Sequence, residues 1–330
     1  MSRRRPVLPV RISGSASLGP GRAIRTAEMV SRLATPRDAA EVERRSGIAS
    51  RYFADAGATN AEVGAAVLRR ALDEAGLAPE SLARIIFVGS LGGDLLFPST
   101  ANLVAAALGL SGTCDCFDLS NACMGFVTAL DIAARGIATG EGPVGIVVVE
   151  LPSRYITPED PRPYLVFGDA AAAAVVERAR GEGGILGSWL RNDGIAFGNV
   201  RLGHPGLTGR AETIRFTASS ARMSEEAIEA VRRASDTLLA DAGLTLDDVQ
   251  WIVPHQPNGT FLDAIIAALG VPDARVVRIV QEFGSIGAAS MPICLDRLRH
   301  TAPVRPGDLV LMVGVGAGIS SGALLLRLDA

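Results

Sequence analysis

Residues 72–86 read LDEAGLAPESLARII, and residues 239–253 read LADAGLTLDDVQWIV. The two stretches align without a gap at a spacing of 167 positions, from Gly76 to Gly243. Each passes from an apolar helical pattern through a glycine and an acidic turn into a short apolar run, which predicts a helix, a tight turn and a buried strand. Two copies half a chain apart indicate two similar α/β halves and not a solenoid, which needs shorter and more numerous repeats.

The rest of the chain alternates in the same way. Helical patterns at residues 61–75 and 225–242 place apolar residues on one side, as expected of helices that cover a sheet. Short apolar runs typical of strands buried on both faces lie at residues 85–88, 144–149, 170–176, 251–253 and 309–313. This alternation predicts α/β layers with mostly parallel strands. A polar, glycine-rich stretch at 177–184 predicts halves of residues 1–178 and 179–330, with a cleft between them as the natural place for a site.

Composition excludes several functions. A net charge of -3 over 330 residues gives no general field that would attract nucleic acid. All 32 basic residues are arginine, so no lysine is present for Schiff-base chemistry. No apolar run reaches the ~18 residues of a membrane-spanning helix, and prolines interrupt the start where a signal peptide would be apolar, so we expect a cytoplasmic protein that does not bind membranes. The four cysteines are expected to be free thiols, and the Cys114-x-Cys116 pair has no nearby ligands for zinc, so no metal is expected.

The stretch around Cys123, FDLSNACMGF at 117–126, carries the first candidate for chemistry. Apolar residues at helical spacing follow it, so Cys123 is predicted where a strand turns into a buried helix. The positive end of a helix dipole favours the thiolate and makes a better nucleophile. The alternative is a plain buried cysteine, the commoner fate of thiols.

His255 is the second candidate. In WIVPHQPN, residues 251–258, it ends a predicted buried strand of the second half. A cysteine and a histidine from different halves can meet across the cleft, which suits nucleophilic catalysis through a thioester. A structural histidine is the alternative interpretation; His204 and His300 look peripheral and receive no role.

Two glycine-rich loops complete the set. Residues 283–292 read FGSIGAASMP and enter a helix, and residues 314–322 read GVGAGISSG after the last buried strand. Glycines in the second loop let the backbone approach a bound group, and its N–H groups could stabilise a thioester oxyanion. A phosphate-binding loop is the alternative, but the spacing fits neither the P-loop nor the dinucleotide-binding pattern.

Taken in order, these four segments, together with FGDA at 167–170, resemble the ketoacyl-acyl-carrier-protein synthase III family over nearly the whole chain. The resemblance implies a thiolase fold, with two similar halves packed as a five-layered αβαβα structure, and a homodimer in which Phe97 reaches the partner's acyl pocket. It also implies that Cys123 carries the acyl group, that His255 acts beside it, and that Gly316, Ala317 and Gly318 form the oxyanion loop. The residues that the resemblance places around the substrate are Arg45, Arg154 and Asn258.

One position departs from the family. Ser285 stands where the family has an asparagine that, with the histidine, holds the malonyl thioester while carbon dioxide leaves. A hydroxyl offers one short donor where a carboxamide offers two, and losing such a donor can cost about 3 kcal/mol in the transition state. The sequence therefore favours an acyltransferase that moves an acyl group intact from Cys123 to a carrier protein, hydroxyl or amine, in fatty-acid-like or polyketide biosynthesis.

Further alternatives and partners follow from the same residues. Decarboxylative condensation with a malonyl-carrier protein is the second hypothesis, and a non-catalytic partner subunit is the third. The resemblance implies an acyl-CoA or an acyl carrier protein as the thioester partner, with no cofactor besides the substrate. The adenine-stacking tryptophan of the family is absent, since Ala39, Ala40, Glu41 and Val42 stand there. The arginine expected shortly after the histidine motif is replaced by Thr260 or its neighbours. These two departures favour a carrier-bound acyl donor, though less than Ser285 favours intact acyl transfer.

Overall fold

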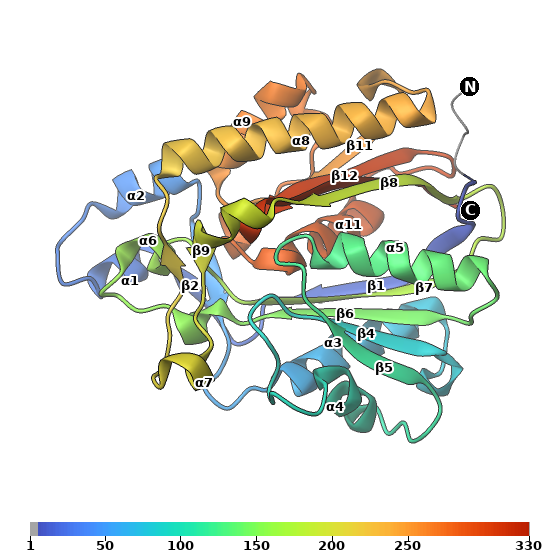
Figure 1. Ribbon diagram of the computed structural model, residues 1–330, viewed down its shortest axis with the longest axis horizontal. Coiled ribbons are helices and arrows are strands. Elements are labelled where there is room, and N and C mark those ends of the chain that lie inside the picture. The colour runs from blue at the N-terminus through green and yellow to red at the C-terminus, as the bar shows by residue number, and fades with distance from the viewer. Residues whose placement is uncertain (1–5, 330) are drawn as a thin grey trace.

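The computed structural model describes residues 6–329 and shows five layers in the order helix, sheet, helix, sheet, helix (Figure 1). β4 pairs in parallel with β5 and β6, whereas β7 runs antiparallel to β6 and to β1. In spatial order the first sheet contains β1 (Val10–Leu18), β7 (Ala170–Arg178), β6 (Val144–Glu150), β4 (Arg84–Val88) and β5 (Asp115–Leu119).

The second sheet repeats part of this pattern. β11 pairs in parallel with β12, and β13 is antiparallel to both β12 and β8. An isolated parallel bridge joins Ile252 of β11 to Val276, at the place where β4 pairs with β5 in the first sheet. In spatial order the strands are β11 (Trp251–Pro254), β12 (Leu309–Gly316), β13 (Ser320–Arg327) and β8 (Gly184–Asn192).

Helices cover the outer faces of the sheets and fill the space between them (Figure 1). The outer layers are α3 (Asn60–Ala75) with α4 (Thr100–Ala107) on the first sheet, and α8 (Ser220–Ala242) with α9 (Gly259–Leu269) on the second. α5 (Gly125–Ala138) and α11 (Ser290–Thr301) form the central layer and contact strands of both sheets. The central apolar cluster includes Phe126, Leu130, Met291 and Leu295, so the two halves share one core.

The repeat seen in the sequence is confirmed. α3 ends at Gly76, a 3₁₀ turn spans Pro79–Ser81, and β4 follows; α8 ends at Gly243, a 3₁₀ turn spans Leu246–Asp248, and β11 follows. Both glycines adopt the left-handed conformation, with φ of 68° and 71°. A residue with a Cβ is strained there, which is why glycine ends both helices. The layered α/β architecture of two similar halves that the sequence predicts is thus what the chain adopts. The expectation of mostly parallel strands is wrong, since three of the strand pairings described in the two main sheets are parallel and four are antiparallel.

Shorter elements gather at one end of the layers, where the carboxyl ends of β4, β6 and β11 also lie (Figure 1). They are β2 (Arg22–Arg25), α1 (Thr26–Ser31), α2 (Ala39–Ser46), β3 (Ser50–Phe53), α6 (Pro161–Tyr164), β9 (Val200–Arg201), α7 (Pro205–Thr208), β10 (Arg215–Phe216) and α10 (Val280–Phe283). The chain leaves the first sheet at Arg178 and enters the second at Gly184. Within residues 6–329, no helix has the length and apolar character needed to cross a membrane.

Candidate active site

Cys123 lies in the tight turn between β5 and α5. Its neighbour Ala122 has a φ of 45°, a conformation that only a few non-glycine residues adopt. The Met124 N–H donates to the Asn121 carbonyl oxygen at 3.1 Å, which closes the turn, and α5 begins at Gly125. Backbone strain of this kind persists where the surroundings fix it, as at many functional sites. The turn presents a half-buried thiol at the start of a buried helix.

The surroundings keep this thiol protonated. Burial, and after it the charge of the nearby Glu150 carboxylate, raise the pKa of Cys123 to about 12. The backbone N–H groups of Ala317 and Cys123 act in the opposite direction and hydrogen-bond the sulfur. The expectation that the helix N-terminus would favour a thiolate is therefore wrong, because the cost of removing the thiolate from water exceeds the gain from these dipoles.

His255 follows β11 and is 2% exposed. Its backbone N–H donates to the Val313 carbonyl oxygen at 2.9 Å, which fixes the start of the loop against β12. Burial lowers the pKa of His255 to about 4, so the imidazole is neutral at neutral pH. Within the described residues, Nδ1 is buried with no hydrogen-bond partner. A neutral imidazole donates from one ring nitrogen and accepts at the other.

Two glycines of β12 bring the cysteine and the histidine together. A Cβ at Gly314 would lie 2.7 Å from the His255 Cβ and 3.1 Å from the Met124 sulfur. A Cβ at Gly316 would lie 2.8 Å from the backbone nitrogen of Cys123. Since residues two apart share one face of a strand, the nucleophile turn and the histidine loop pack side by side on β12. The turn that carries Cys123 and the loop that carries His255, one from each half, therefore lie next to each other on β12.

Ser285 belongs to the loop that precedes α11. The side chain is 5% exposed, and the backbone is held by hydrogen bonds to Val166 and Gly168 of the first half. Gly284 on one side of it has a φ of 70°, and the loop continues through the 3₁₀ turn Gly287–Ala289 into α11. The Ala288 Cβ lies 3.6 Å from where a Cβ on Gly125 would stand. The loop that carries Ser285 thus packs against the first turn of α5.

Glu150 is a residue of this region that the sequence reasoning missed. It ends β6, is 2% exposed and accepts a hydrogen bond from the Ala288 N–H at 3.2 Å. Burial raises the pKa of its carboxyl to about 7. The signal was present in the sequence, because Glu150 is the single charged residue at the end of the apolar run 144–149.

Two further amides hold the catalytic loops. The Asn121 side-chain oxygen accepts hydrogen bonds from the Asn192 amide at 3.0 Å and the Ser320 hydroxyl at 3.1 Å, which ties the nucleophile turn to the start of β13. The Gln256 side-chain oxygen accepts from the Ile279 N–H at 2.9 Å, and its amide donates to the Val277 carbonyl oxygen at 2.6 Å. Asn121 lies two residues before Cys123 and Gln256 directly follows His255, so these hydrogen bonds fix the backbone on which each candidate lies.

Comparison with known proteins places this geometry in a family. Residues 117–194 match the 3-oxoacyl-[acyl-carrier-protein] synthase III family, and residues 239–328 match its C-terminal part. The beta-ketoacyl-[acyl-carrier-protein] synthase III of Rhizorhabdus wittichii is 34% identical over 319 residues, which cover 96% of this chain and 98% of the relative. The chain belongs to the 3-oxoacyl-[acyl-carrier-protein] synthase III family. It is an acyl-transferring enzyme of the thiolase superfamily.

Solved structures of synthase III proteins have the same fold. The 3-oxoacyl-[acyl-carrier-protein] synthase III of Aquifex aeolicus superimposes with a TM-score of 0.88 at 30% identity, over 96% of this chain and 99% of that one. The priming beta-ketosynthase of the R1128 polyketide pathway gives 0.89 at 30% identity, over 99% and 98%. By TM-score and by sequence identity, this chain is about as similar to one of these two structures as to the other.

Arg45 and Asn258, two of the residues assigned to the substrate of a synthase III enzyme, lie where α2 meets the start of α9. The Arg45 carbonyl oxygen accepts a hydrogen bond from the Thr260 hydroxyl at 2.5 Å, and the Arg45 side chain is 79% exposed. The Asn258 side-chain oxygen caps α9 by accepting from the Phe261 N–H at 2.8 Å. Its side-chain oxygen therefore has a structural role that the sequence reasoning did not include.

Arg154 and Phe97 lie elsewhere. The Arg154 guanidinium donates to the Ala58 carbonyl oxygen and lies 4.0 Å from the Asp94 carboxylate, so it contacts residues of the first half. Phe97 is 88% exposed on the loop after β4, with Leu96 beside it at 87%.

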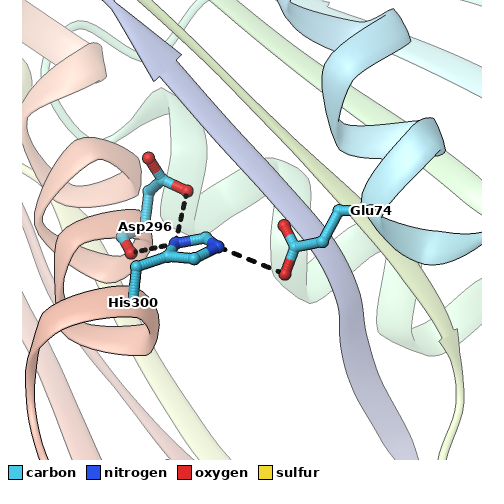
Figure 2. A group of neighbouring side chains, drawn as sticks. All are labelled: Glu74, Asp296 and His300. Carbon is cyan, nitrogen blue, oxygen red and sulfur yellow. Dashed lines mark hydrogen bonds and ion pairs between the residues drawn. The ribbon is translucent and has the colours of Figure 1, made fainter.

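A histidine and two carboxylates elsewhere come close enough to resemble a metal site. His300 Nε2 lies 3.4 Å from Glu74, and His300 Nδ1 lies 3.3 Å from Asp296, so that α11 and α3 are linked across β1 (Figure 2). Arg299 also lies 2.9 Å from the Glu74 carboxylate. Because an arginine already supplies positive charge there, the group is explained as an ionic link between the two halves.

Proposed function

We propose that the chain catalyses decarboxylative condensation of an acyl thioester with a malonyl-carrier protein, with Cys123 holding the acyl group. The observation that carries the proposal is the packing of Cys123 and His255 side by side on β12, with two backbone N–H groups directed at the sulfur. Relatives that cover nearly the whole chain are named for this reaction, which supports condensation over the intact acyl transfer that the sequence favoured.

In the first step the Cys123 sulfur attacks the carbonyl carbon of the acyl donor. A carbon–sulfur bond forms, the carbonyl oxygen takes up the negative charge, and the N–H groups of Ala317 and Cys123 stabilise it. The bond to the donor thiol then breaks, and that thiolate leaves with the proton that Cys123 gives up. The site contributes N–H donors that are fixed in place before the reaction, so no reorganisation is needed when the charge forms.

In the second step a malonyl thioester replaces the first donor. Its carbon–carboxylate bond breaks, carbon dioxide leaves, and the electron pair forms an enolate whose oxygen accepts hydrogen bonds from neutral His255 and from Ser285. The enolate carbon attacks the acyl carbonyl, and the Cys123 thiolate leaves and regains a proton. A neutral histidine suits this role. The lowered pKa of the imidazolium keeps the ring neutral at neutral pH, and the N–H group of a neutral ring donates a hydrogen bond to the enolate without transferring its proton.

Intact acyl transfer remains the second candidate because of Ser285. With one hydroxyl in place of a carboxamide, enolate stabilisation is weaker, whereas loading and unloading of Cys123 require no enolate. In that reaction a carrier-protein thiol, a hydroxyl or an amine attacks the acyl-Cys123 carbonyl, and the Cys123 thiolate leaves. Both candidates belong to fatty-acid-like or polyketide biosynthesis, and both need only thioester substrates without a resident cofactor or metal.

The donor is proposed to be an acyl-CoA or an acyl carrier protein that enters past α2 and α9. Arg44 and Arg45 are exposed there and offer positive charge to a phosphate group or to an acidic carrier protein. Asn258 offers an amide at the start of α9. Arg154 is proposed as a further contact for the donor.

A second copy of the chain is proposed to complete the site. β5 is the edge of the first sheet and leads directly into Cys123, and an unpaired edge strand is a template for pairing with another strand. The side chains of Leu96, Phe97, Ile195 and Phe197 are 73–92% exposed, and such groups of exposed apolar side chains mark interaction surfaces. Phe97 lies three residues before α4, whose first N–H groups, those of Thr100 and Ala101, donate to Asp118 of β5, so a partner aligned along β5 would lie close to Phe97. This arrangement supports the homodimer that the resemblance implies.

Product analysis decides between the two reactions. The enzyme is incubated with an acyl-CoA panel and malonyl-carrier protein carrying ¹⁴C in the free carboxylate. Condensation predicts one labelled carbon dioxide for each β-ketoacyl-carrier protein detected by mass spectrometry. Two results together would favour intact transfer. With free carrier protein as acceptor, acyl-carrier protein forms; with labelled malonyl-carrier protein, no labelled carbon dioxide is released.

A further inference from the structure

Glu150 is a buried carboxyl group that neither step of the proposed reaction uses. It is 2% exposed at the end of a strand whose other residues are all apolar. Removing a carboxylate from water is costly unless hydrogen bonds compensate. One oxygen, Oε1, receives three of them: from the Ser90 hydroxyl at 2.5 Å, the Ser90 N–H at 3.1 Å and the Ala288 N–H at 3.2 Å.

These hydrogen bonds join three segments, and two of them, the end of β4 and the Ser285 loop, pack against Gly125 beside the nucleophile turn. Ser90 follows β4, Glu150 ends β6, and Ala288 belongs to the loop that carries Ser285. A Cβ at Gly287 would lie 3.0 Å from the Glu150 carboxyl carbon, so the loop passes directly over the carboxyl group. The same loop packs on Gly125, two residues after Cys123. The carboxyl group therefore fixes where the Ser285 loop lies relative to the nucleophile.

The charge on Glu150 also acts on the thiol. After burial it is the largest influence that raises the pKa of Cys123. Burial raises the pKa of Glu150, and the hydrogen bonds from Ser90 and Ala288 lower it. Asp169, which directly precedes β7, is the charged group that acts on Glu150, and it also raises this pKa. Asp169 is in turn influenced by Arg154. With a pKa of about 7, Glu150 changes its charge in the range where the enzyme would work.

We propose that Glu150 is a positioning residue with an electrostatic role: it holds the Ser285 loop against the nucleophile turn, and its negative charge suppresses the Cys123 thiolate while the site is empty. The proposal rests on Cys123 being the nucleophile of the proposed function. It goes beyond that function by assigning control of the thiol to a residue outside the cysteine, histidine and serine set. Protonation of Glu150, or neutralisation of its charge when substrate binds, releases the thiol for attack.

Glu150→Gln separates the charge from the hydrogen bonds. The carboxamide has nearly the same shape, and its oxygen can still accept from Ser90 and Ala288. The readout is the rate of alkylation of Cys123 by iodoacetamide from pH 6 to 10, measured by peptide mass spectrometry without any acyl donor. Glu177→Gln is the matched control, since Glu177 lies on the adjacent β7 and pairs with Arg11. Circular dichroism checks that each variant is folded.

In the wild type, the logarithm of the alkylation rate should rise with pH, because more thiolate forms. It should flatten near pH 7, where Glu150 ionises and its charge raises the pKa of Cys123, and then rise again. Glu150→Gln should show no flattening and should react about fourfold faster at pH 8, since one pKa unit gives tenfold more thiolate that is individually less nucleophilic. Glu177→Gln should match the wild type. Equal rates and equal pH profiles in wild type and Glu150→Gln would overturn the electrostatic role.

Ser90→Ala is the second test and does not depend on the first. It removes the hydroxyl hydrogen bond but keeps the carboxyl group, so the pKa of Glu150 should rise and the flattening should move to higher pH. A profile identical to that of the wild type would overturn the proposal. Because alkylation needs no acyl transfer, a protein that follows these profiles but does not condense would contradict the proposed function and leave this inference standing.

Discussion

Burial controls the protonation of Cys123 and His255, the two side chains that are proposed to act on the substrate. It raises the pKa of Cys123 to about 12 and lowers the pKa of His255 to about 4, so the resting pair is a thiol beside a neutral imidazole and not an ion pair. A resting thiol resists alkylation and oxidation, because the thiolate is the reactive form. Activation then depends on what substrate binding changes, including the charge on Glu150.

Ser285 carries the first prediction at the residue scale. Ser285→Asn should raise the rate of malonyl decarboxylation by about tenfold or more, because the carboxamide supplies a stronger donor to the enolate. Acylation of Cys123 should be unchanged, since it forms no enolate. The measurement is labelled carbon dioxide release beside intact-mass acylation kinetics.

Ser285→Ala is the matched variant for this test. It should slow decarboxylation while the rate of acylation stays the same. If the alanine variant decarboxylates as fast as the wild type, the hydroxyl does not take part in enolate stabilisation.

His255 carries a prediction about pH. Its pKa is lowered from 6.5 in the unfolded chain to about 4 in the folded protein, so between these values the unfolded chain binds more protons. The contribution of His255 to stability is complete above pH 6.5 and is lost as pH falls toward 4. The free energy of unfolding of the wild type, relative to His255→Gln, should fall by at most about 1.4 kcal/mol per pH unit in this range. Urea unfolding measures it, and a constant difference would contradict the neutral, buried ring.

At this scale the sequence was most informative for Cys123 and His255, because short motifs surround both. The position of Glu150, a charged residue at the end of the apolar run 144–149, was visible in the sequence, but its role was not, since this role depends on a hydrogen bond to Ala288, 138 residues away. The protonation of Cys123 was predicted wrongly, because the dipole of α5 can be read from the sequence whereas the extent of burial cannot. The cap that Asn258 forms on α9 could have been predicted from the helix that follows it.

At the scale of the element, β12 is the part of the site that tolerates least change. Gly316→Ala would place a Cβ 2.8 Å from the Cys123 nitrogen and 3.1 Å from the Ala122 Cβ, both in a turn that is already strained. We expect a loss of activity of about 10²-fold from the displaced oxyanion donors, with a loss of about 1–3 kcal/mol in stability. Steady-state kinetics and urea unfolding measure the two effects.

Gly57→Ala is the control for this substitution, because a Cβ added at Gly57 would meet no atom within 4 Å and the φ of Gly57 is not positive. It should change the free energy of unfolding by no more than about 0.5 kcal/mol. A Gly316→Ala variant as active as Gly57→Ala would mean that the Ala317 segment does not form the oxyanion site.

The repeated helix, glycine and strand were predictable because each is a local pattern with its own physical cause. The left-handed glycines at 76 and 243 occupy equivalent positions and end equivalent helices. The loops of the site were less predictable, since they have little regular pattern and their conformations depend on contacts between the halves. The Ser285 loop is an example, because its backbone is held by Val166 and Gly168 of the other half.

At the scale of the whole molecule, the two sheets share one central core through α5 and α11. This sharing explains why the site needs both halves: the nucleophile turn starts α5, and the Ser285 loop starts α11. The polar link of His300 and Asp296 on α11 to Glu74 on α3 adds a second connection across β1 (Figure 2). The sequence predicted two halves, but the extent of their common core is visible only in the structure.

The proposed homodimer gives a prediction at this scale. Light scattering coupled to gel filtration should find twice the mass of one chain. The double substitution Leu96→Asp and Phe97→Asp places charge on the exposed apolar loop and should raise the dimer dissociation constant by about tenfold or more. Arg69→Asp, on the exposed side of α3, is the control. A wild type that is monomeric at micromolar concentration would contradict the dimer.

The most direct test of the central claim is the mass of the intact protein before and after each half of the reaction. With an acyl-CoA as donor, the wild type should gain one acyl group, which hydroxylamine removes, and Cys123→Ala should gain none. Adding malonyl-carrier protein should return the enzyme to its original mass while β-ketoacyl-carrier protein and carbon dioxide appear in equal amounts. An adduct that persists in Cys123→Ala, or a wild type that takes up no acyl group from any donor of the panel, would contradict the account.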